Sequence, residues 1–334
     1  MEIIKVQETI NSVVTNIETV ILGKAGEIKL VLAALLAGGH VLLEDVPGTG
    51  KTVLAKSLAR SFDCDFSRVQ FTPDLLPSEL TGINFFSPKT GDFTFREGSL
   101  FSNIILADEI NRATPRTQSG LLESMEERQI TVDGTTYQLP APYFVIATQN
   151  PVETQGTFPL PEAQMDRFLL QLNLGYPIKE DSVEILKRFV SGEPLKEIKA
   201  VCSSQTLLEL QKAVKDVYIH EDIYKYIVDL AQGTRTHEGV ALGISTRGIL
   251  ALAKMAQAYC AINGRGFVTP QDVLYLVPYV FPHRIVLKGG VRNRQSAVLS
   301  MLDEIIANTT APVEDWKSAD PKMDRVKERK LQPL

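Results

Sequence analysis

Short apolar runs alternate with longer amphipathic stretches over the first half of the chain. Five runs have the look of buried strands: residues 41–43, 68–71, 104–107, 144–147 and 168–172. Nearly continuous apolar runs of this length are typical of strands that are buried on both faces of a parallel sheet. Helical patterns lie between most of them, so the first half of the chain is predicted to form an α/β fold with a parallel five-stranded sheet.

Two helices are predicted ahead of the first strand, over residues 4–19 and 25–38. After residue 177 the pattern changes, and only helix-period stretches occur: residues 183–189, 207–217, 223–230, 247–261 and 295–308. This change favours a separate, smaller all-α domain. The predicted organisation is an α/β core over 1–176, a helical domain over 177–310 and a charged C-terminal tail over 311–334.

The composition is that of an ordinary soluble chain, with 44% apolar and 22% charged residues among 334. The net charge of −5 argues against a protein whose main role is coating nucleic acid, although it leaves room for a local basic stripe. The longest apolar run near the N-terminus, residues 30–37, is too short to span a bilayer. No signal-peptide pattern precedes it, so we expect no transmembrane segment and a cytoplasmic location.

Neither the cysteines nor the histidines have the spacing of a metal site. The three cysteines are far apart and include no C-x-x-C pair, so they are expected to be small buried thiols. The four histidines are expected to be structural or surface residues. Two neighbours after Pro282, His283 and Arg284, could touch an interface.

A glycine-rich segment between the first strand and a helical pattern is the strongest local signal. Residues 44–52 have the sequence EDVPGTGKT. Such a turn aims backbone N–H groups and a helix N-terminus at an anion, Lys51 can reach terminal phosphates, and the Thr52 hydroxyl can bind Mg²⁺. The general pattern G-x-x-x-x-G-K-[ST] has glycine where this chain has Asp45. The expected ligand is a nucleoside triphosphate, and the alternative is an incidental Pro-Gly turn.

Polar residues follow two of the later strands. Asp108 and Glu109 end the run at 104–107, where Asp108 would hold Mg²⁺ and Glu109 would polarise the water that attacks the γ-phosphate. Asn150 follows the run at 144–147 and can donate to the γ-phosphate and orient that water. Taken singly, the acids could be an exposed strand end, and Asn150 could be a turn residue before Pro151.

Two arginines are candidates for binding phosphate charge. Arg167 lies just before the last strand and could be supplied in trans to a neighbouring subunit, where an arginine stabilises the charge of phosphoryl transfer. The alternative is a surface ion pair with Asp166. Arg247 opens a helix that Ser245 or Thr246 could cap, and it could reach nucleotide phosphates or simply face solvent.

One residue runs against helix preferences. Thr114 and Pro115 start a helix well, yet Gly120 lies inside it, where it lowers helix stability by about 1 kcal/mol relative to alanine. Either a neighbouring element packs closely against Gly120, or the glycine is merely tolerated.

Together these segments resemble the AAA+ ATPases, and the MoxR family in particular. The similarity lies in residues 43–52, 70–78, 106–113, 147–151 and 160–168, and it extends over roughly 5–310. Asp45 fits the version of the phosphate loop found in this family. The resemblance implies a P-loop AAA+ core followed by a helical lid, and it implies hairpin insertions, for which residues 73–99 and 129–143 are suitably placed.

The resemblance also implies a role for each candidate residue. Lys51 and Thr52 correspond to Walker A and Asp108 and Glu109 to Walker B, while Asn150 corresponds to sensor 1, Arg167 to the arginine finger and Arg247 to sensor 2. The catalytic set is thus Glu109, Asn150, Arg167 and Arg247, and Thr52 and Asp108 would bind Mg²⁺. The residues implied to bind ATP are Ile21, Gly23, Pro47, Gly48, Thr49, Gly50, Lys51, Thr52, Val53 and Asp108. Whether Arg247 acts on the ATP of its own subunit or of a neighbour stays open, because the lid of relatives can be displaced.

The family resemblance implies ring-forming, often hexameric ATPases that assist maturation of, or metal insertion into, partner proteins, commonly with von Willebrand factor A (vWA) domains. A nucleic-acid motor is the first competitor, but residues 129–143 contain no Lys or Arg, and residues 73–99 contain only Lys89 and Arg96. Nucleic acid is therefore an unlikely partner. A chelatase motor subunit would share all the ATPase parts. A non-hydrolysing nucleotide sensor is disfavoured by the presence of Glu109, Asn150 and Arg167.

Overall fold

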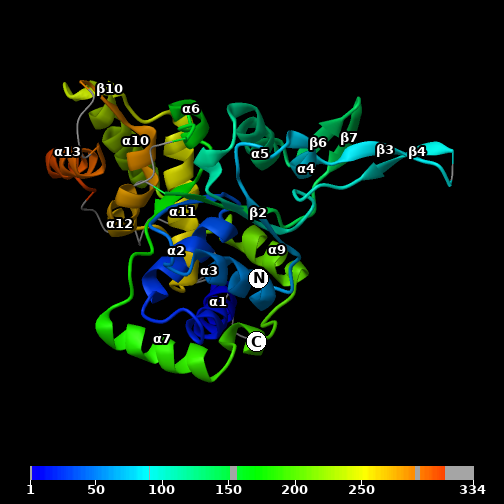
Figure 1. Ribbon diagram of the computed structural model, residues 1–334. Coiled ribbons are helices and arrows are strands. Elements are labelled where there is room, and N and C mark those ends of the chain that lie inside the picture. Colours follow the sequence, from blue (N-terminus) through cyan, green and yellow to red (C-terminus); the bar gives the residue numbers. More distant parts are fainter. Residues whose placement is uncertain (1, 90, 151–155, 290–293, 313–334) are drawn as a thin grey trace, which may run out of the picture.

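A computed structural model describes residues 2–89, 91–150, 156–289 and 294–312 of the chain. Its centre is a parallel five-stranded sheet with the order β2-β5-β8-β1-β9, which confirms the predicted sheet (Figure 1). The strands are β1 (Val41–Glu44), β2 (Phe66–Gln70), β5 (Ile104–Asp108), β8 (Phe144–Gln149) and β9 (Leu170–Leu172). Because all neighbours are parallel, the carboxyl ends of β1, β2, β5 and β8 meet at one edge of the sheet.

Successive side chains of the central strands pack alternately into two separate hydrophobic clusters. Ile104 and Leu106 of β5 pack in one cluster, and Ile105 and Ala107 pack in the other, on the opposite face. The first face is covered by α2 (Ala25–Leu36) and α3 (Lys51–Ser61), on which α1 (Ile3–Glu18) packs, and the second by α5 (Pro115–Glu127). Burial on both faces explains why these strands are apolar along their whole length.

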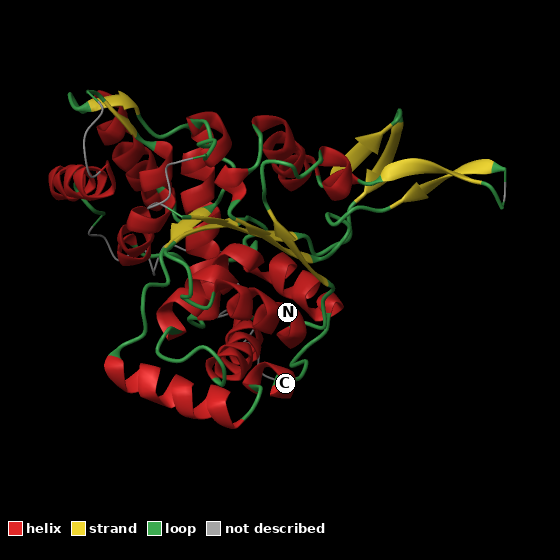
Figure 2. Ribbon diagram, in the orientation of Figure 1, coloured by secondary structure: helices red, strands yellow, loops and turns green. Residues whose placement is uncertain are grey.

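Two β-hairpins project from the core on the α5 side, as the yellow strands of Figure 2 show. They are β3 (Ile83–Ser87) with β4 (Asp92–Arg96), which follow the short helix α4 (Pro77–Thr81), and β6 (Gln129–Val132) with β7 (Thr135–Gln138). Both predicted hairpins are thus confirmed. Asp133 and Gly134 have φ values of 49° and 81°, the pattern of positive angles that a tight hairpin turn requires. The rings of Phe95 and Tyr137 stack with centroids 3.9 Å apart and join the two hairpins.

The second half of the chain is helical, as predicted. Its helices are α7 (Lys179–Ser191), α8 (Pro194–Glu197), α9 (Ser204–Val214), α10 (Glu221–Thr236), α11 (Thr246–Ile262), α12 (Pro270–Val280) and α13 (Arg294–Asn308). The structure adds an antiparallel pair of short strands, β10 (Val240–Leu242) and β11 (Val286–Leu287). The sequence did not predict them, because two or three residues are too few to show an alternating pattern.

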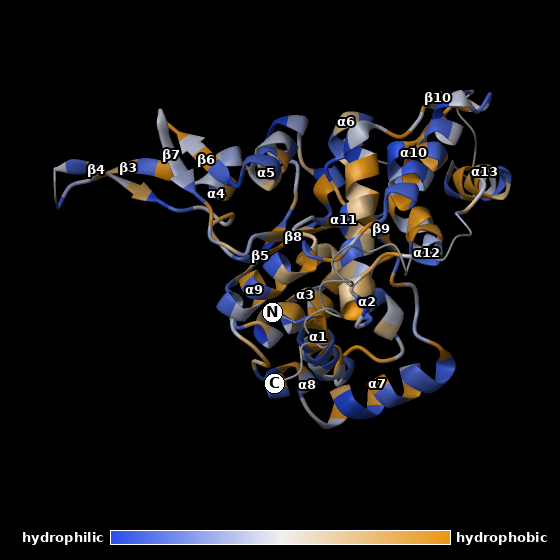
Figure 3. Cartoon of the chain, turned by 180° about the vertical axis from the view of Figure 1, so that it is seen from behind, coloured by the Kyte–Doolittle hydropathy of each residue, from blue (hydrophilic) through white to orange (hydrophobic). Residues whose placement is uncertain are grey.

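The helical half packs directly on the core. Helix α11 contacts α1 and α2, and one continuous hydrophobic cluster runs through all three. Figure 3 shows hydrophobic residues along α2 and α11. The predicted boundary between residues 176 and 177 stays a prediction, and residues 313–334 of the predicted tail lie outside the described residues.

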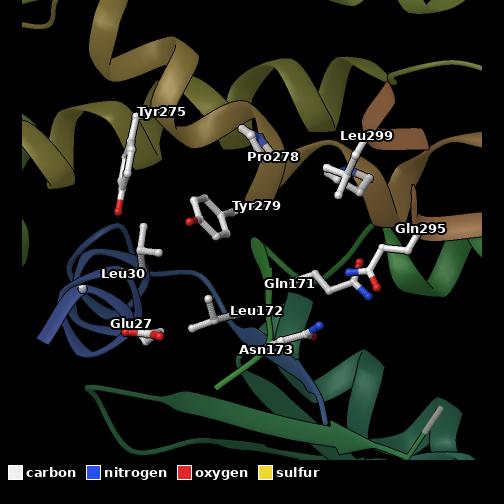
Figure 4. A pocket seen from close by; sticks show the side chains of 12 residues that line it. Glu27, Leu30, Gln171, Leu172, Asn173, Tyr275, Pro278, Tyr279, Gln295 and Leu299 are labelled. Carbon is white, nitrogen blue, oxygen red and sulfur yellow. The ribbon is translucent and has the colours of Figure 1, made fainter. Parts of the chain in front are cut away.

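A pocket of about 460 Å³ lies where the helical half meets the edge strand β9. Figure 4 shows its walls: Glu27 and Leu30 come from α2, Leu172 from β9, and Tyr275 and Tyr279 from α12. Among the helices of the described residues, none is long and apolar enough to cross a membrane.

Candidate functional site

The glycine-rich segment forms a loop between β1 and α3 that is shaped to bind an anion. Gly48 and Gly50 have φ values of 87° and 90°, which only glycine adopts without strain, and Gly50 is the N-cap of α3. Lys51 Nζ donates to the carbonyl oxygens of Asp45, at 2.8 Å, and Val46, at 3.2 Å. The N-terminus of α3 and the Lys51 ammonium therefore lie at the same loop, which favours binding of negatively charged phosphates.

The Asp45 side chain makes hydrogen bonds that a glycine at this position could not make. One carboxylate oxygen accepts hydrogen bonds from the backbone N–H groups of Leu174 and Gly175, each at 2.9 Å, and the other accepts from Val46 N at 2.9 Å. The side chain is buried, with a residue exposure of 6%. Asp45 thus fastens the start of the phosphate loop to the segment that follows β9.

The two acids at the end of β5 are positioned by Thr148 of β8. The Thr148 hydroxyl donates to Asp108 Oδ1 at 2.7 Å and accepts from the backbone N–H of Glu109 at 2.8 Å. Glu109 has a positive φ of 57°, a conformation that is uncommon outside glycine. Strained backbone of this kind is common at functional sites.

A chain of polar contacts links the two acids through β2. Arg68 donates to Asp108 Oδ2 at 2.7 and 3.2 Å and to Gln70 Oε1 at 2.9 Å. Gln70 Nε2 in turn donates to Glu109 Oε2 at 2.7 Å, and Arg112 Nε lies 3.0 Å from the same oxygen. The sequence prediction missed Arg68, Gln70 and Thr148. Their signal was the polar end of each strand, but only the strand order brings β2 beside β5.

Most of the predicted site residues line a single pocket of about 430 Å³. Lys51 and Thr52 line it from the phosphate loop, Asp108 and Glu109 from the end of β5, and Asn150 from the end of β8. The remaining wall residues are Pro47, Gly48, Gly50, Val53, Arg68, Gln70, Thr148 and Gln149. The residues around this space suit a magnesium-bound triphosphate, since the Thr52 hydroxyl and the Asp108 carboxylate would offer oxygen ligands to Mg²⁺.

An apolar pocket of about 260 Å³ adjoins the polar one and shares Gly48, Gly50 and Val53 with it. Its other wall residues are Val20, Ile21, Leu22, Lys24, Thr49, Gly175, Pro177, Ile185 and Phe189. Ile185 and Phe189 belong to α7 and were not predicted. Gly23 faces α7 as well, since a Cβ on it would lie 1.9 Å from Asp181 Oδ2. A polar pocket that adjoins an apolar one suits a ligand with a charged group at one end and a planar ring at the other.

The two candidate arginines lie together at a different place, against the last turn of α5. Arg167 Nε is 3.1 Å from Glu126 Oε2, and a terminal nitrogen of Arg247 contacts Glu126 Oε1. Met125, Glu126, Arg167 and Arg247 line a small cavity of about 70 Å³. Neither arginine lines the polar or the apolar pocket described above.

The expected alternative partner of Arg167, Asp166, is engaged elsewhere, so that ion pair is wrong. Asp166 Oδ1 lies 2.7 Å from Nε of the buried Arg284, and Asp166 Oδ2 accepts from Ser245 Oγ at 2.9 Å. Ser245 also caps α11 by accepting from Gly248 N at 3.1 Å. His283 adds a hydrogen bond of 2.9 Å between Nε2 and the carbonyl of Phe168. These bonds fix the start of α11 to the segment that carries Arg167.

Two family models match the chain. Residues 40–170 match the model described as ATPase family associated with various cellular activities (AAA), and residues 232–304 match that of the AAA lid domain. The first range contains the phosphate loop, the acids and Arg167, and the second contains Arg247.

Individual relatives agree with this result. The uncharacterized protein YeaC of Bacillus subtilis (strain 168) is 47% identical over 90% of this chain and 94% of its own length. The chaperone MoxR1 of Mycobacterium tuberculosis is 39% identical over 84% of this chain and 76% of its own length. The protein MoxR of Paracoccus denitrificans is 31% identical over 88% of this chain and 93% of its own length.

A crystal structure of a protein from Cytophaga hutchinsonii, assigned as an ATPase, superposes with a TM-score of 0.85 and 36% identity. The match covers 93% of this chain and 97% of that one. With this fold, these site residues and relatives that match over most of their length, the chain belongs to the MoxR family of AAA+ ATPases.

Proposed function

We propose that the chain hydrolyses ATP with Mg²⁺ in a cytoplasmic ring, which we expect to be hexameric, and uses the energy to remodel partner proteins. The observation that supports this proposal is that the residues expected to take part in hydrolysis lie at two separate places. The phosphate loop and the acids surround one pocket, whereas Arg167 and Arg247 lie together outside it. A site that needs an arginine for transition-state charge is then completed by a second copy of the chain.

The pocket residues have distinct roles in this proposal. The apolar pocket holds the adenine ring of ATP against Ile21. The N–H groups of the phosphate loop and Lys51 bind the phosphates. Bound Mg²⁺ would neutralise phosphate charge, with Thr52 and Asp108 as its protein ligands. Asp108 is held in place by Arg68 and by Thr148.

Glu109 acts as the base that takes a proton from the attacking water, and Asn150 orients that water beside the γ-phosphate. Gln70 keeps the Glu109 carboxylate in position through its 2.7 Å hydrogen bond. Arg167 and Arg247 contact the γ-phosphate bound to the neighbouring copy, so Arg247 acts in trans. The fixed contact of α11 with Asp166 supports this assignment, because it keeps Arg247 beside Arg167.

Protein partners suit the projecting hairpins better than nucleic acid does. Phe85, Phe86 and Phe93 are exposed on β3 and β4, whereas Lys89 and Arg96 are the only cationic residues between 73 and 99. The relative named chaperone MoxR1 supports a chaperone-like role. We propose maturation of, or metal insertion into, a partner with a vWA domain. A chelatase-like motor subunit is the alternative, since it would use the same ATPase site.

The deciding experiment measures ATP turnover per subunit against protein concentration, for the wild type and Arg167→Ala. A composite site predicts turnover that rises with concentration and collapses in the variant, while the affinity for ATP is retained. Mass photometry over the same concentrations reports the size of the particle. The proposal of a ring would be wrong if the particles stayed monomeric and turnover depended on neither protein concentration nor Arg167.

A further inference from the structure

We propose that Glu126 is a positioning residue that holds Arg167 and Arg247 as one preformed pair for the triphosphate bound to a second copy of the chain. The inference rests on the proposed function and adds a residue to it. Glu126 belongs to neither pocket of its own subunit, yet it is the carboxylate that both arginines share.

Charge explains why the pair needs a shared anion. Two guanidinium groups that lie against the same cavity of about 70 Å³ carry like charges and repel each other. The Glu126 carboxylate between them offsets this repulsion with one attractive contact to each arginine. The side chains of Glu126, Arg167 and Arg247 are 37%, 30% and 44% exposed, so an incoming phosphate can reach the cluster.

The geometry lets Glu126 stay bound while the arginines work. Arg167 approaches Glu126 through Nε, and Arg247 approaches it through a terminal nitrogen. A guanidinium has five N–H donors on more than one edge, so it can hold a carboxylate with one edge and a phosphate with another. Each long side chain otherwise loses rotamer entropy on being fixed, and preorganisation removes part of that loss from the docking step.

Hydrogen bonds anchor the backbone around the cluster. Glu126 follows Met125, whose carbonyl accepts from His40 Nε2 at 3.0 Å, and Arg167 follows Asp166, which is bonded to Arg284 and Ser245. These anchors hold the three backbones whether or not Glu126 is present. Replacing Glu126 should therefore change the side-chain arrangement of the arginines without unfolding the subunit.

The test mixes two kinds of inactive subunit. Lys51→Ala subunits lack ATP binding but keep their arginines, and Arg167→Ala subunits bind ATP but lack the arginine. A composite site predicts that the mixture regains turnover. Glu126→Ala is then placed in one kind of subunit or the other. We expect turnover to fall about tenfold when the change is in the Lys51→Ala subunit, which donates the arginines, and to stay unchanged when it is in the Arg167→Ala subunit.

Three further measurements accompany the mixing. Glu127→Ala, an exposed neighbour on the same turn, is the matched control and should have no effect in either subunit. In the otherwise wild-type chain, Glu126→Ala should lower kcat with KM for ATP unchanged, and Glu126→Asp should restore part of kcat. Mass photometry with a non-hydrolysable ATP analogue should show that Glu126→Ala needs a higher protein concentration for assembly.

The outcomes separate the two claims. If the mixture without a Glu126 change regains no turnover, the composite site itself fails. If the mixture is active and the placement of Glu126→Ala makes no difference, the composite site stands and the role of Glu126 is wrong. A matched loss in both placements, with a lower melting temperature, would make Glu126 a structural residue and also overturn the inference.

Discussion

Gln70 Nε2 donates a 2.7 Å hydrogen bond to Glu109 Oε2, and this bond joins the last residue of β2 to the residue that follows β5, 39 positions further along the chain. It ties the position of the proposed base to the neighbouring strand β2. Arg112, three residues after Glu109, contacts the same carboxylate oxygen. The base is thus held between a neutral donor and a cation.

Replacing Gln70 with alanine should therefore misplace the Glu109 carboxylate. We expect Gln70→Ala to lower kcat roughly tenfold and to leave KM for ATP nearly unchanged, since the contact orients the base and does not bind the substrate. Glu109→Gln should keep ATP binding and lose turnover. Steady-state kinetics, with Gln138→Ala in the exposed hairpin as a control, would test this; equal kcat in Gln70→Ala and the wild type would contradict it.

Asp45 gives a prediction about stability and binding together. Asp45→Gly would restore the glycine of the general phosphate loop, but it removes three acceptor contacts from a buried carboxylate. We expect about 2–3 kcal/mol lower free energy of unfolding and weaker ATP binding, because backbone N–H groups of Leu174 and Gly175 lose their partner. Urea unfolding and titration with a fluorescent ATP analogue would measure both. Wild-type values in both assays would show that the loop does not depend on Asp45.

Gly120 is tolerated rather than required. A Cβ on Gly120 would meet only Thr81 Cγ2, at 3.9 Å, which is an ordinary contact. Gly120→Ala should therefore raise the free energy of unfolding by about 1 kcal/mol through its helix preference. Gly82→Ala is the opposite control, because Gly82 has a φ of 88° and its Cβ would lie 2.4 Å from the carbonyl oxygen of Arg96. Thermal unfolding of the two variants should shift in opposite directions.

Two buried histidines predict a loss of stability in mild acid. Burial lowers the pKa of His40 and of His283 well below the usual value of about 6.5. His40 Nδ1 accepts from Val145 N at 3.0 Å, so the folded chain keeps this ring neutral. Below pH 6.5 the unfolded chain binds protons that the folded chain excludes, and the free energy of unfolding falls by up to about 1.4 kcal/mol per pH unit for each histidine.

Urea unfolding between pH 7.5 and 5.5 would measure this dependence. Stability should be full above pH 6.5 and decline as the pH falls through the window below it. In His40→Gln the overall stability is lower, but its slope with pH should be shallower than that of the wild type. Identical slopes would mean that His40 is not the group responsible.

Local sequence signals were enough to predict the elements and most of the residues that line the candidate phosphate pocket. The apolar strands, the phosphate loop and the acids at 108 and 109 are each defined by neighbouring residues, because strand burial, positive φ at glycine and helix capping act over a few positions. The strand order then placed Lys51, Thr52, Asp108, Glu109 and Asn150 around one pocket. The short strands β10 and β11 escaped notice because they are too brief to leave a pattern.

The rest was decided by tertiary structure. No local pattern pairs Gln70 with Glu109, or Arg167 and Arg247 with Glu126, since these contacts depend on which strands lie side by side and on where α11 docks. That docking follows from the continuous hydrophobic cluster between α11, α1 and α2, and from the Asp166 contacts with Arg284 and Ser245. The sequence by itself determined which chemical groups the chain has and on which elements they lie. Packing of the apolar surfaces decided which of those groups meet, because burial is non-directional and only the folded arrangement fixes the partners of each side chain.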